Sequence, residues 1–253
     1  MLSKRIIACL DVRNGSVVKG INFEGLRVAG DPGELSQRYN RDGIDEIVIL
    51  DVTATIEKRK ALADTIHAVA KEIFLPLCVG GGIKDEAHAD AAIEAGADKV
   101  SLNTAAIANP ELLTTLARRY GSQAVVVAID AKRVDDIFQI YVRSGQQATR
   151  RDAVDWAREA ADRGAGEILL TSIDRDGTKS GFDCELTAAV SNAVSIPVIA
   201  SGGAGTFDHF VDVFTKGQAH AALAASIFHY NEHAVSDLKN HLRQNGIPVR
   251  LSC

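Results

Sequence analysis

The sequence predicts a (β/α)8 barrel, a single domain over residues 1–253 that is built from two similar (β/α)4 halves. Apolar segments of strand length alternate with segments of helix length along the whole chain. The length of 253 residues is the usual size of such a barrel. The same sequence patterns also recur at an offset of about 120 residues, which indicates two halves related by a pseudo-two-fold axis.

The predicted strands are continuous runs of apolar residues, the pattern expected of parallel strands that are covered on both faces. They are Ile6–Asp11, Glu46–Asp51, Leu75–Val79, Lys99–Leu102, Ala124–Asp130, Glu167–Thr171, Pro197–Ala200 and His220–Ala224. Residues Ile137–Val142 instead alternate apolar and polar side chains. This alternation predicts a further strand in a small hairpin.

Helices are predicted between most of these strands, and several have start or stop signals. The pairs Asp31-Pro32 and Asn109-Pro110 are typical of helix starts. Glycines follow the last predicted turn of four helices, at Gly43, Gly96, Gly121 and Gly164.

A glycine turn follows an apolar strand once in each half. Pro76–Gly82 contains the first turn and Pro197–Gly203 the second. After each turn come a helix and a strand that ends in small polar residues. Glycines after a strand let backbone N–H groups approach an anion, to which the next helix adds its N-terminal dipole. Two such turns in register predict a ligand with a phosphate at each end.

Two carboxylates occupy equivalent places in the halves. Asp11 and Asp130 each end the first strand, and catalytic groups of such barrels lie at the C-terminal strand ends. A general acid and a general base on opposite sides of an elongated substrate would have this arrangement. An Asp at a strand end can instead cap the next loop or helix. A symmetry-related pair beside two phosphate turns favours catalysis.

Composition excludes several other classes of protein. The net charge of −5 gives no basic field for nucleic acid. No apolar run approaches the roughly 20 residues of a membrane-spanning helix, and the start of the chain lacks the apolar core of a signal peptide. The four cysteines are scattered, so we expect reduced thiols, a cytoplasmic protein, and neither a metal site nor a cofactor.

Six motifs together resemble the family of imidazole glycerol phosphate synthase cyclase subunits, known as HisF. They are Lys4–Val12, Val17–Gly20, Gly80–Ile83, Ala95–Ser101, Asp174–Thr178 and Ile199–Gly205. The resemblance implies a lyase of histidine biosynthesis. Its members use ammonia to convert a formimino-aminoimidazole carboxamide ribonucleotide with a ribulose phosphate (PRFAR) into imidazole glycerol phosphate and an aminoimidazole carboxamide ribotide (AICAR). That substrate has a phosphate at each end.

The resemblance also implies roles for individual residues. Asp11 and Asp130 would be the acid/base pair, and Lys19 would lie on a mobile loop that closes over the substrate. Residues implied at the first phosphate are Gly82, Asn103 and Thr104, and those at the second are Gly177, Gly203, Ala225 and Ser226. The other expected substrate contacts are Asp51, Thr171, Asp176, Ser201 and Gly202.

The family pattern further implies a separate glutaminase subunit of the HisH type at the N-terminal face of the barrel, because this chain has no glutaminase triad. Four charged residues begin strands at that face, namely Arg5, Glu46, Lys99 and Glu167. They could be a neutral plug, a gate that admits ammonia, or both. Asp98, next to Lys99, is expected to contact the partner.

Some positions depart from the family pattern, namely Ala8, Val28 and the segment 143–151. The altered segment leaves open a non-catalytic relative that binds a phosphorylated ligand or a glutaminase without turnover. A second alternative is the related isomerase of the same pathway. Val17–Gly20 argues against the isomerase, because that enzyme typically has Arg in this motif.

Overall fold

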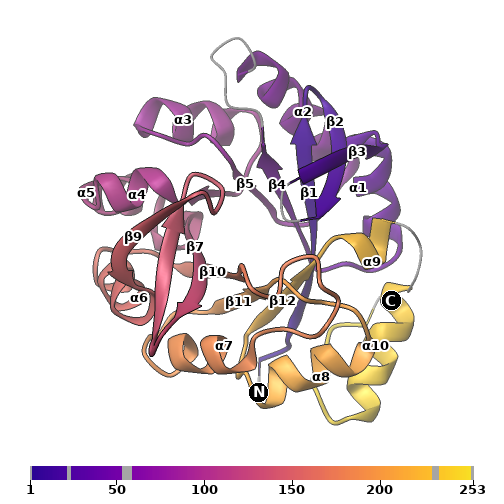
Figure 1. The fold of residues 1–253 in the computed structure, drawn as a ribbon. Helices are drawn as coiled ribbons and strands as arrows, with labels where there is room; N and C mark the ends of the chain where they lie inside the picture. The colour runs from indigo at the N-terminus through magenta and orange to yellow at the C-terminus, as the bar shows by residue number, and fades with distance from the viewer. Residues whose placement is uncertain (1, 22–23, 53–58, 230–233, 252–253) are drawn as a thin grey trace. The chain divides into compact units, whose positions relative to one another are not determined.

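The computed structural model describes residues 2–21, 24–52, 59–229 and 234–251. Its strands form a 12-stranded sheet with the parallel order β1-β4-β5-β6-β7-β10-β11-β12, and β12 is again the neighbour of β1. Helices lie between the parallel strands along the chain (Figure 1). This closed order is that of a (β/α)8 barrel, so the predicted fold class is confirmed.

The parallel strands are β1 (Arg5–Arg13), β4 (Glu46–Asp51), β5 (Leu77–Gly80), β6 (Lys99–Leu102), β7 (Val125–Val134), β10 (Glu167–Ser172), β11 (Val198–Ser201) and β12 (Ala221–Ala224). The helices are α1 (Pro32–Arg41), α2 (Arg59–Glu72), α3 (Glu86–Glu94), α4 (Thr104–Ala108), α5 (Glu111–Tyr120), α6 (Ala153–Asp162), α7 (Cys184–Ser191), α8 (Phe207–Thr215), α9 (Ser226–His229) and α10 (Val235–Gln244). A short 3-10 helix, η2, covers Ser122–Ala124. No helix among these described residues is long and apolar enough to cross a membrane.

The chain divides into two compact units, whose bounds differ from those of the predicted halves because the C-terminal residues belong to unit 1. Unit 1 contains Met1–Ser101 and Ala224–Cys253, and unit 2 contains Leu102–Leu223. In unit 1, β1 pairs in parallel with β4, and β4 with β5. In unit 2, β7 pairs in parallel with β10, and β10 with β11. The interiors of these strands are apolar and buried, as the sequence pattern predicted.

An antiparallel hairpin follows the first strand of each unit. In unit 1, β2 (Ser16–Ile21) pairs with β1 and β3 (Glu24–Gly30) pairs with β2. In unit 2, β8 (Ile137–Val142) pairs with β7, and β9 (Gln147–Asp152) pairs with β8. The prediction of a strand at Ile137–Val142 is therefore confirmed. The other hairpin strands were not predicted.

Local sequence signals fix most helix ends. The Asp31 carboxylate accepts hydrogen bonds from the N–H groups of Gly33 and Glu34 and so caps α1, as predicted. The predicted stop glycines all have positive φ, from +83° at Gly43 to +116° at Gly96. The start predicted at Asn109-Pro110 was one residue early. Pro110 is the N-cap of α5, whereas Asn109 is the C-cap of α4.

Candidate active site

Asp130 lies in unit 2 where parallel pairing gives way to the hairpin. It pairs with Thr171 of β10 on one side and with Tyr141 of β8 on the other. The parallel ladder with β10 ends one residue later, at Ala131. The strand itself continues to Val134, so Asp130 ends the parallel part of β7 and not the whole strand. Its place at the C-terminal end of the parallel ladder agrees with the sequence prediction.

The surroundings of Asp130 favour its protonated form. Burial and the negative charge of Asp176 raise the pKa of the Asp130 carboxyl from the ordinary 3.8 to about 6. Hydrogen bonds from the Asn103 and Thr171 side chains favour the charged form and lower this pKa. The Asn103 Nδ2 atom donates to Asp130 Oδ2 at 2.8 Å. A carboxyl with a pKa near 6 can both take up and release a proton near neutral pH.

Asp11 occupies the equivalent place in unit 1. It pairs with Leu50 of β4, and the parallel ladder with β4 ends one residue later, at Val12. The thiol of Cys9 lies 3.7 Å from Asp11 Oδ1. As with Asp130, the strand continues beyond the carboxylate, here to Arg13, and its last two residues pair with β2 of the hairpin. The repeated position of Asp11 and Asp130 relative to the sheets of their own units is therefore a property of the fold.

The first glycine turn has the features of an anion site in unit 1. A Cβ at Gly81 would lie 2.2 Å from the backbone oxygen of Asp51, the last residue of β4. Gly82 has φ +81° and open space where a side chain would lie. Its N–H has no acceptor within the described part of the chain. An anion could therefore approach the backbone at Gly82.

The second glycine turn has the same features in unit 2. Ser201 ends β11, and Gly202 follows with φ +91° and a close approach to the backbone of Ser172. At Gly203, a Cβ would lie 2.1 Å from the oxygen of Gly181. The N–H groups of Gly203 and Gly177 lack an acceptor among the residues that the structure describes.

Asn103 and Thr104 lie at the junction of β6 and α4. Thr104 Oγ1 accepts a hydrogen bond from the backbone N–H of Arg143 at 3.1 Å. Arg143 and Ser144 form the turn between β8 and β9 and both have positive φ, +54° and +57°. The segment 143–151, which departs from the family pattern, is thus an ordered hairpin held to Thr104.

Three other predicted contacts lie in unit 1. Ala225 follows β12, and its carbonyl accepts from the N–H of Phe228. Ser226 begins α9, and Lys19 lies in β2. The side chains of Ser226 and Lys19 lie outside the described part of the structure.

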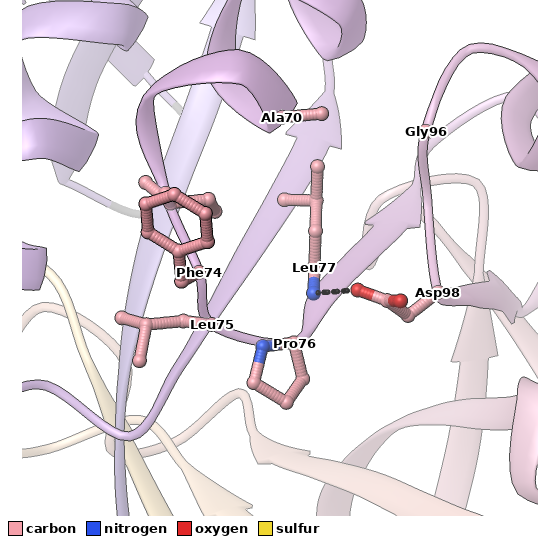
Figure 2. A pocket seen from close by; sticks show the side chains of 8 residues that line it. Ala70, Phe74, Leu75, Pro76, Leu77, Gly96 and Asp98 are labelled. Carbon is pink, nitrogen blue, oxygen red and sulfur yellow. Dashed lines mark hydrogen bonds between the residues drawn. The ribbon is translucent and has the colours of Figure 1, made fainter.

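Asp98 borders a hollow in unit 1, between the end of α2 and the starts of β5 and β6 (Figure 2). Its carboxylate accepts from the N–H of Leu77 at 2.8 Å. The hollow has a volume of about 400 Å³, and Phe74, Leu75 and Pro76 line one side of it. Phe74 is 95% exposed. Asp98 was expected from the sequence as a partner contact, but the apolar residues beside it were not named there. The prediction placed Leu75 and Pro76 inside a strand, whereas β5 begins only at Leu77.

Three of the four predicted charges at the strand starts form one cluster in unit 1. Glu46 Oε2 accepts from Arg5 Nη1 at 2.6 Å, and Glu46 Oε1 accepts from Lys99 Nζ at 2.8 Å. The Glu46 side chain is 1% exposed. In unit 2, Glu167 begins β10 and is also buried.

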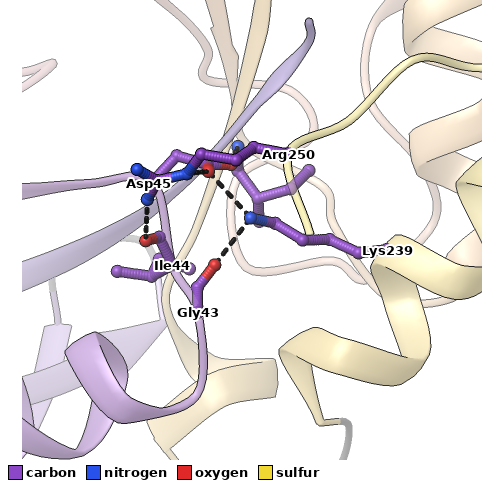
Figure 3. A network of polar contacts seen from close by, with 6 residues as sticks. Gly43, Ile44, Asp45, Lys239 and Arg250 are labelled. Carbon is purple, nitrogen blue, oxygen red and sulfur yellow. Dashed lines mark hydrogen bonds and ion pairs between the residues drawn. The ribbon is translucent and has the colours of Figure 1, made fainter. Parts of the chain in front are cut away.

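A second buried ion pair lies on the other side of the same strand starts (Figure 3). Lys239 of α10 donates to Asp45 Oδ1 at 2.7 Å and to the carbonyl of Gly43 at 2.6 Å. Asp45 Oδ2 accepts from the N–H of Ile6 at 2.8 Å, and Arg250 contacts Asp45 Oδ1 at 3.2 Å. Asp45 directly precedes Glu46, the first residue of β4, yet the two carboxylates contact different cations.

No group of His, Cys, Asp or Glu side chains within the described residues could hold a metal ion. The buried cysteines Cys9 and Cys78 form no disulfide with any residue that the structure describes.

Comparison with known proteins identifies the group to which the chain is similar. Residues 5–234 match the family model described as "Histidine biosynthesis protein". The chain is 57% identical to the imidazole glycerol phosphate synthase subunit HisF of Acidobacterium capsulatum over 253 residues, all of both chains. It is 55% identical to that of Alkaliphilus metalliredigens and 53% identical to one from Dehalococcoides mccartyi, each over 251 residues and at least 99% of both chains.

Proposed function

The chain belongs to the histidine biosynthesis protein family, and we propose that it is the cyclase subunit of an imidazole glycerol phosphate synthase. In this role it uses ammonia to convert PRFAR into imidazole glycerol phosphate and AICAR. The full-length similarity to three HisF subunits supports this assignment. The observation that carries the chemistry is Asp130, whose carboxyl has a pKa of about 6 at the end of a parallel ladder.

Asp130 and Asp11 are the proposed acid/base pair. Ammonia that condenses with the carbonyl group of a ribulose phosphate loses two protons as the imine forms, and the carbonyl oxygen gains two protons and leaves as water. A carboxyl group with a pKa near the working pH can take part in both transfers. Asp11 is assigned the complementary transfer because it has the equivalent position in the other unit.

The two glycine turns are proposed to bind the two phosphates of PRFAR. Gly82, Asn103 and Thr104 are assigned to one phosphate, and Gly177, Gly203, Ala225 and Ser226 to the other. Support comes from N–H groups at Gly82, Gly177 and Gly203 that have no acceptor in the described chain. We assign Asp51, Thr171, Asp176, Ser201, Gly202 and Lys19 to further substrate contacts. A crystal grown in high phosphate should contain an anion at both turns, and one empty turn would contradict the assignment.

The proposed source of ammonia is a separate glutaminase subunit of the HisH type. The relatives are themselves named as subunits. Asp98 and the neighbouring exposed residues Phe74 and Pro76 would bind this partner, because adjoining exposed apolar side chains can mark an interaction surface. Arg5, Glu46, Lys99 and Glu167 would be the gate for ammonia. We further propose that the chain acts in the cytoplasm as one folding domain.

Turnover by the purified chain with PRFAR and ammonium at alkaline pH tests this proposal. The expected products are imidazole glycerol phosphate and AICAR in equal amounts. The related isomerase would act without ammonia, on a phosphorylated sugar precursor. A non-catalytic relative would bind PRFAR and release it unchanged, and either result would overturn the proposal.

A further inference from the structure

Asn103 stands at the N-cap position of α4 but does not cap the helix. Asn is among the residues most favoured at this position, because its side-chain oxygen can accept from the first free N–H groups of the helix. Here the backbone of Asn103 has φ −119° and ψ −90°, and the side chain makes no capping hydrogen bond. Asn103 is therefore a residue type suited to capping α4, but its side chain does not cap the helix.

The side chain is turned toward Asp130 instead. Asn103 Nδ2 donates to Asp130 Oδ2 at 2.8 Å, and both residues lie in unit 2. The other polar atom, Asn103 Oδ1, is buried and has no hydrogen-bond partner within the part of the chain that is described. The amide cannot simply be reversed, because two acceptors would then face each other while Asp130 is ionised.

A buried acceptor without a partner is unfavourable for folding, so fold stability does not explain this orientation. In native structures such a group calls for an explanation, such as a catalytic role or a partner from outside the chain. An acceptor atom would repel the oxygens of a phosphate. Oδ1 is therefore suited to an N–H or O–H group on the ligand.

We propose that Asn103 is a positioning residue, which fixes the ionised Asp130 carboxylate through Nδ2 and accepts a hydrogen bond from the substrate through Oδ1. This inference rests on the proposed function for the identity of the substrate, but not for the contact with Asp130. It assigns the Asn103 side chain to the reacting region. Thr104 and the backbone N–H groups at the junction of β6 and α4 then remain as the groups that bind the phosphate.

The contact with Asp130 has a consequence for its titration. The groups that act on this carboxyl within unit 2 are Asp176, the Thr171 hydroxyl and the Asn103 amide, and Tyr141 is its neighbour on β8. Asp176 opposes ionisation, whereas the two hydrogen-bond donors favour it. Removal of the Asn103 donor should raise the Asp130 pKa above its present value of about 6.

Carbon-13 NMR of the substrate-free protein tests the contact directly. The Asp130 carboxyl resonance is assigned by its loss in Asp130→Asn and titrated in wild type, Asn103→Leu and Asn103→Asp. We expect a higher Asp130 pKa in Asn103→Leu, by about one unit, and a larger increase in Asn103→Asp, which adds a like charge. Thr104→Val is the matched control, because its hydroxyl contacts Arg143 and not Asp130.

Kinetics with PRFAR and saturating ammonium provide the second readout. In Asn103→Leu, kcat should fall about 10- to 100-fold. The acidic limb of the pH–rate profile should move to higher pH, because the Asp130 pKa is raised. Thr104→Val should mainly raise KM. An unchanged Asp130 titration in both Asn103 variants would overturn the proposal, as would a rise in KM alone. Because the NMR titration needs no substrate, it remains decisive even if the wild-type chain does not turn over PRFAR.

Folding is checked by thermal melting of the same variants. Asn103→Leu removes a buried unpaired acceptor but also the donor to Asp130, so we expect only a small change in the melting temperature. A large decrease in Asn103→Leu together with a normal Asp130 titration in Asn103→Asp would indicate a structural residue and refute the positioning role.

Discussion

Two desolvated carboxylates, one in each unit, have opposite surroundings. Glu46 in unit 1 is 1% exposed and contacts two cations, Arg5 at 2.6 Å and Lys99 at 2.8 Å. Asp130 in unit 2 receives hydrogen bonds from a neutral amide and a hydroxyl and is repelled by Asp176. Burial of an acid therefore does not by itself indicate catalysis. The groups around the carboxylate decide its role. Neighbouring cations stabilise a permanent negative charge, whereas neutral hydrogen-bond donors allow the carboxyl group to gain and lose a proton.

The adjacent Asp45 extends this contrast within unit 1. Its side chain is 6% exposed and contacts Lys239, whose own side chain is 3% exposed. Burial lowers the pKa of Lys239, while Asp45 opposes that change. The two opposite charges of Lys239 and Asp45 neutralise each other, and the ion pair joins α10 to the start of β4. This arrangement favours a structural role. We therefore expect substitutions at Asp45 to affect stability and substitutions at Asp130 to affect turnover.

The largest expected effect is on turnover. Asp130→Asn and Asp11→Asn should each reduce kcat with PRFAR and saturating ammonium by about 10²–10⁴-fold, because each removes a proposed proton-transfer group. Circular dichroism should confirm that both variants remain folded. A near-normal rate in either variant would remove that residue from the proposed pair.

The next effect is on folding. Lys239→Met leaves the buried Asp45 carboxylate with one cation, the exposed Arg250, so the free energy of unfolding should fall by about 3 kcal/mol. Urea denaturation measures this change. Lys216→Met is the matched control, because Lys216 pairs with Asp212 at 2.8 Å on the surface, and its stability should be unchanged within error. Equal losses in the two variants would contradict the distinction between buried and exposed pairs.

A smaller effect is the pH dependence of stability at Asp130. The raised pKa means that the folded protein binds this proton more tightly than the unfolded chain does. The resulting stabilisation is complete below the ordinary pKa of 3.8 and is lost as the pH rises through about 6. The stability of Asp130→Asn relative to wild type should therefore increase as the pH rises from 3.8 to about 6, and the gain should reach at most about 3 kcal/mol by pH 7.

Unfolding of Asp130→Asn and wild type by urea at pH 4, 5, 6 and 7 measures this difference. Asp208→Asn, a change in the exposed first turn of α8, is the control and should give no comparable trend. A difference that is constant with pH would show that the Asp130 carboxyl is not perturbed.

The smallest expected effect separates a gate from a plug at Glu46. In the complex with a glutaminase, Lys99→Ala or Glu167→Ala should lower glutamine-dependent turnover at least about tenfold, a barrier change of about 1.4 kcal/mol. Turnover with saturating ammonium should change much less, because free ammonia does not depend on transfer from the partner. Equal losses in both assays, with a large fall in melting temperature, would identify a structural plug.

The sequence alone determined the features that depend on local pattern. The apolar run Ile6–Leu10 predicted a buried strand. Its side chains alternate between the two faces of the sheet, and apolar residues on both faces must be covered by other parts of the protein. Asp31-Pro32 predicted a helix start because capping uses atoms only two or three residues away. The glycine turns and the repeated aspartates were also visible, since each half carries its own copy of the pattern.

Other features depend on residues that are far apart in the chain, and only the tertiary structure decided them. Gln147–Asp152 is polar and has no strand pattern, yet it is a strand because β8 supplies its hydrogen bonds. Nothing in the sequence indicated that Lys239 pairs with Asp45, because the two residues are 194 positions apart in the chain. Asn103 reads as a helix cap, but Asp130, 27 residues later, takes its amide. The fold brings the Asp130 carboxylate within hydrogen-bond distance of Asn103. The side chain makes this contact in place of a capping hydrogen bond to α4.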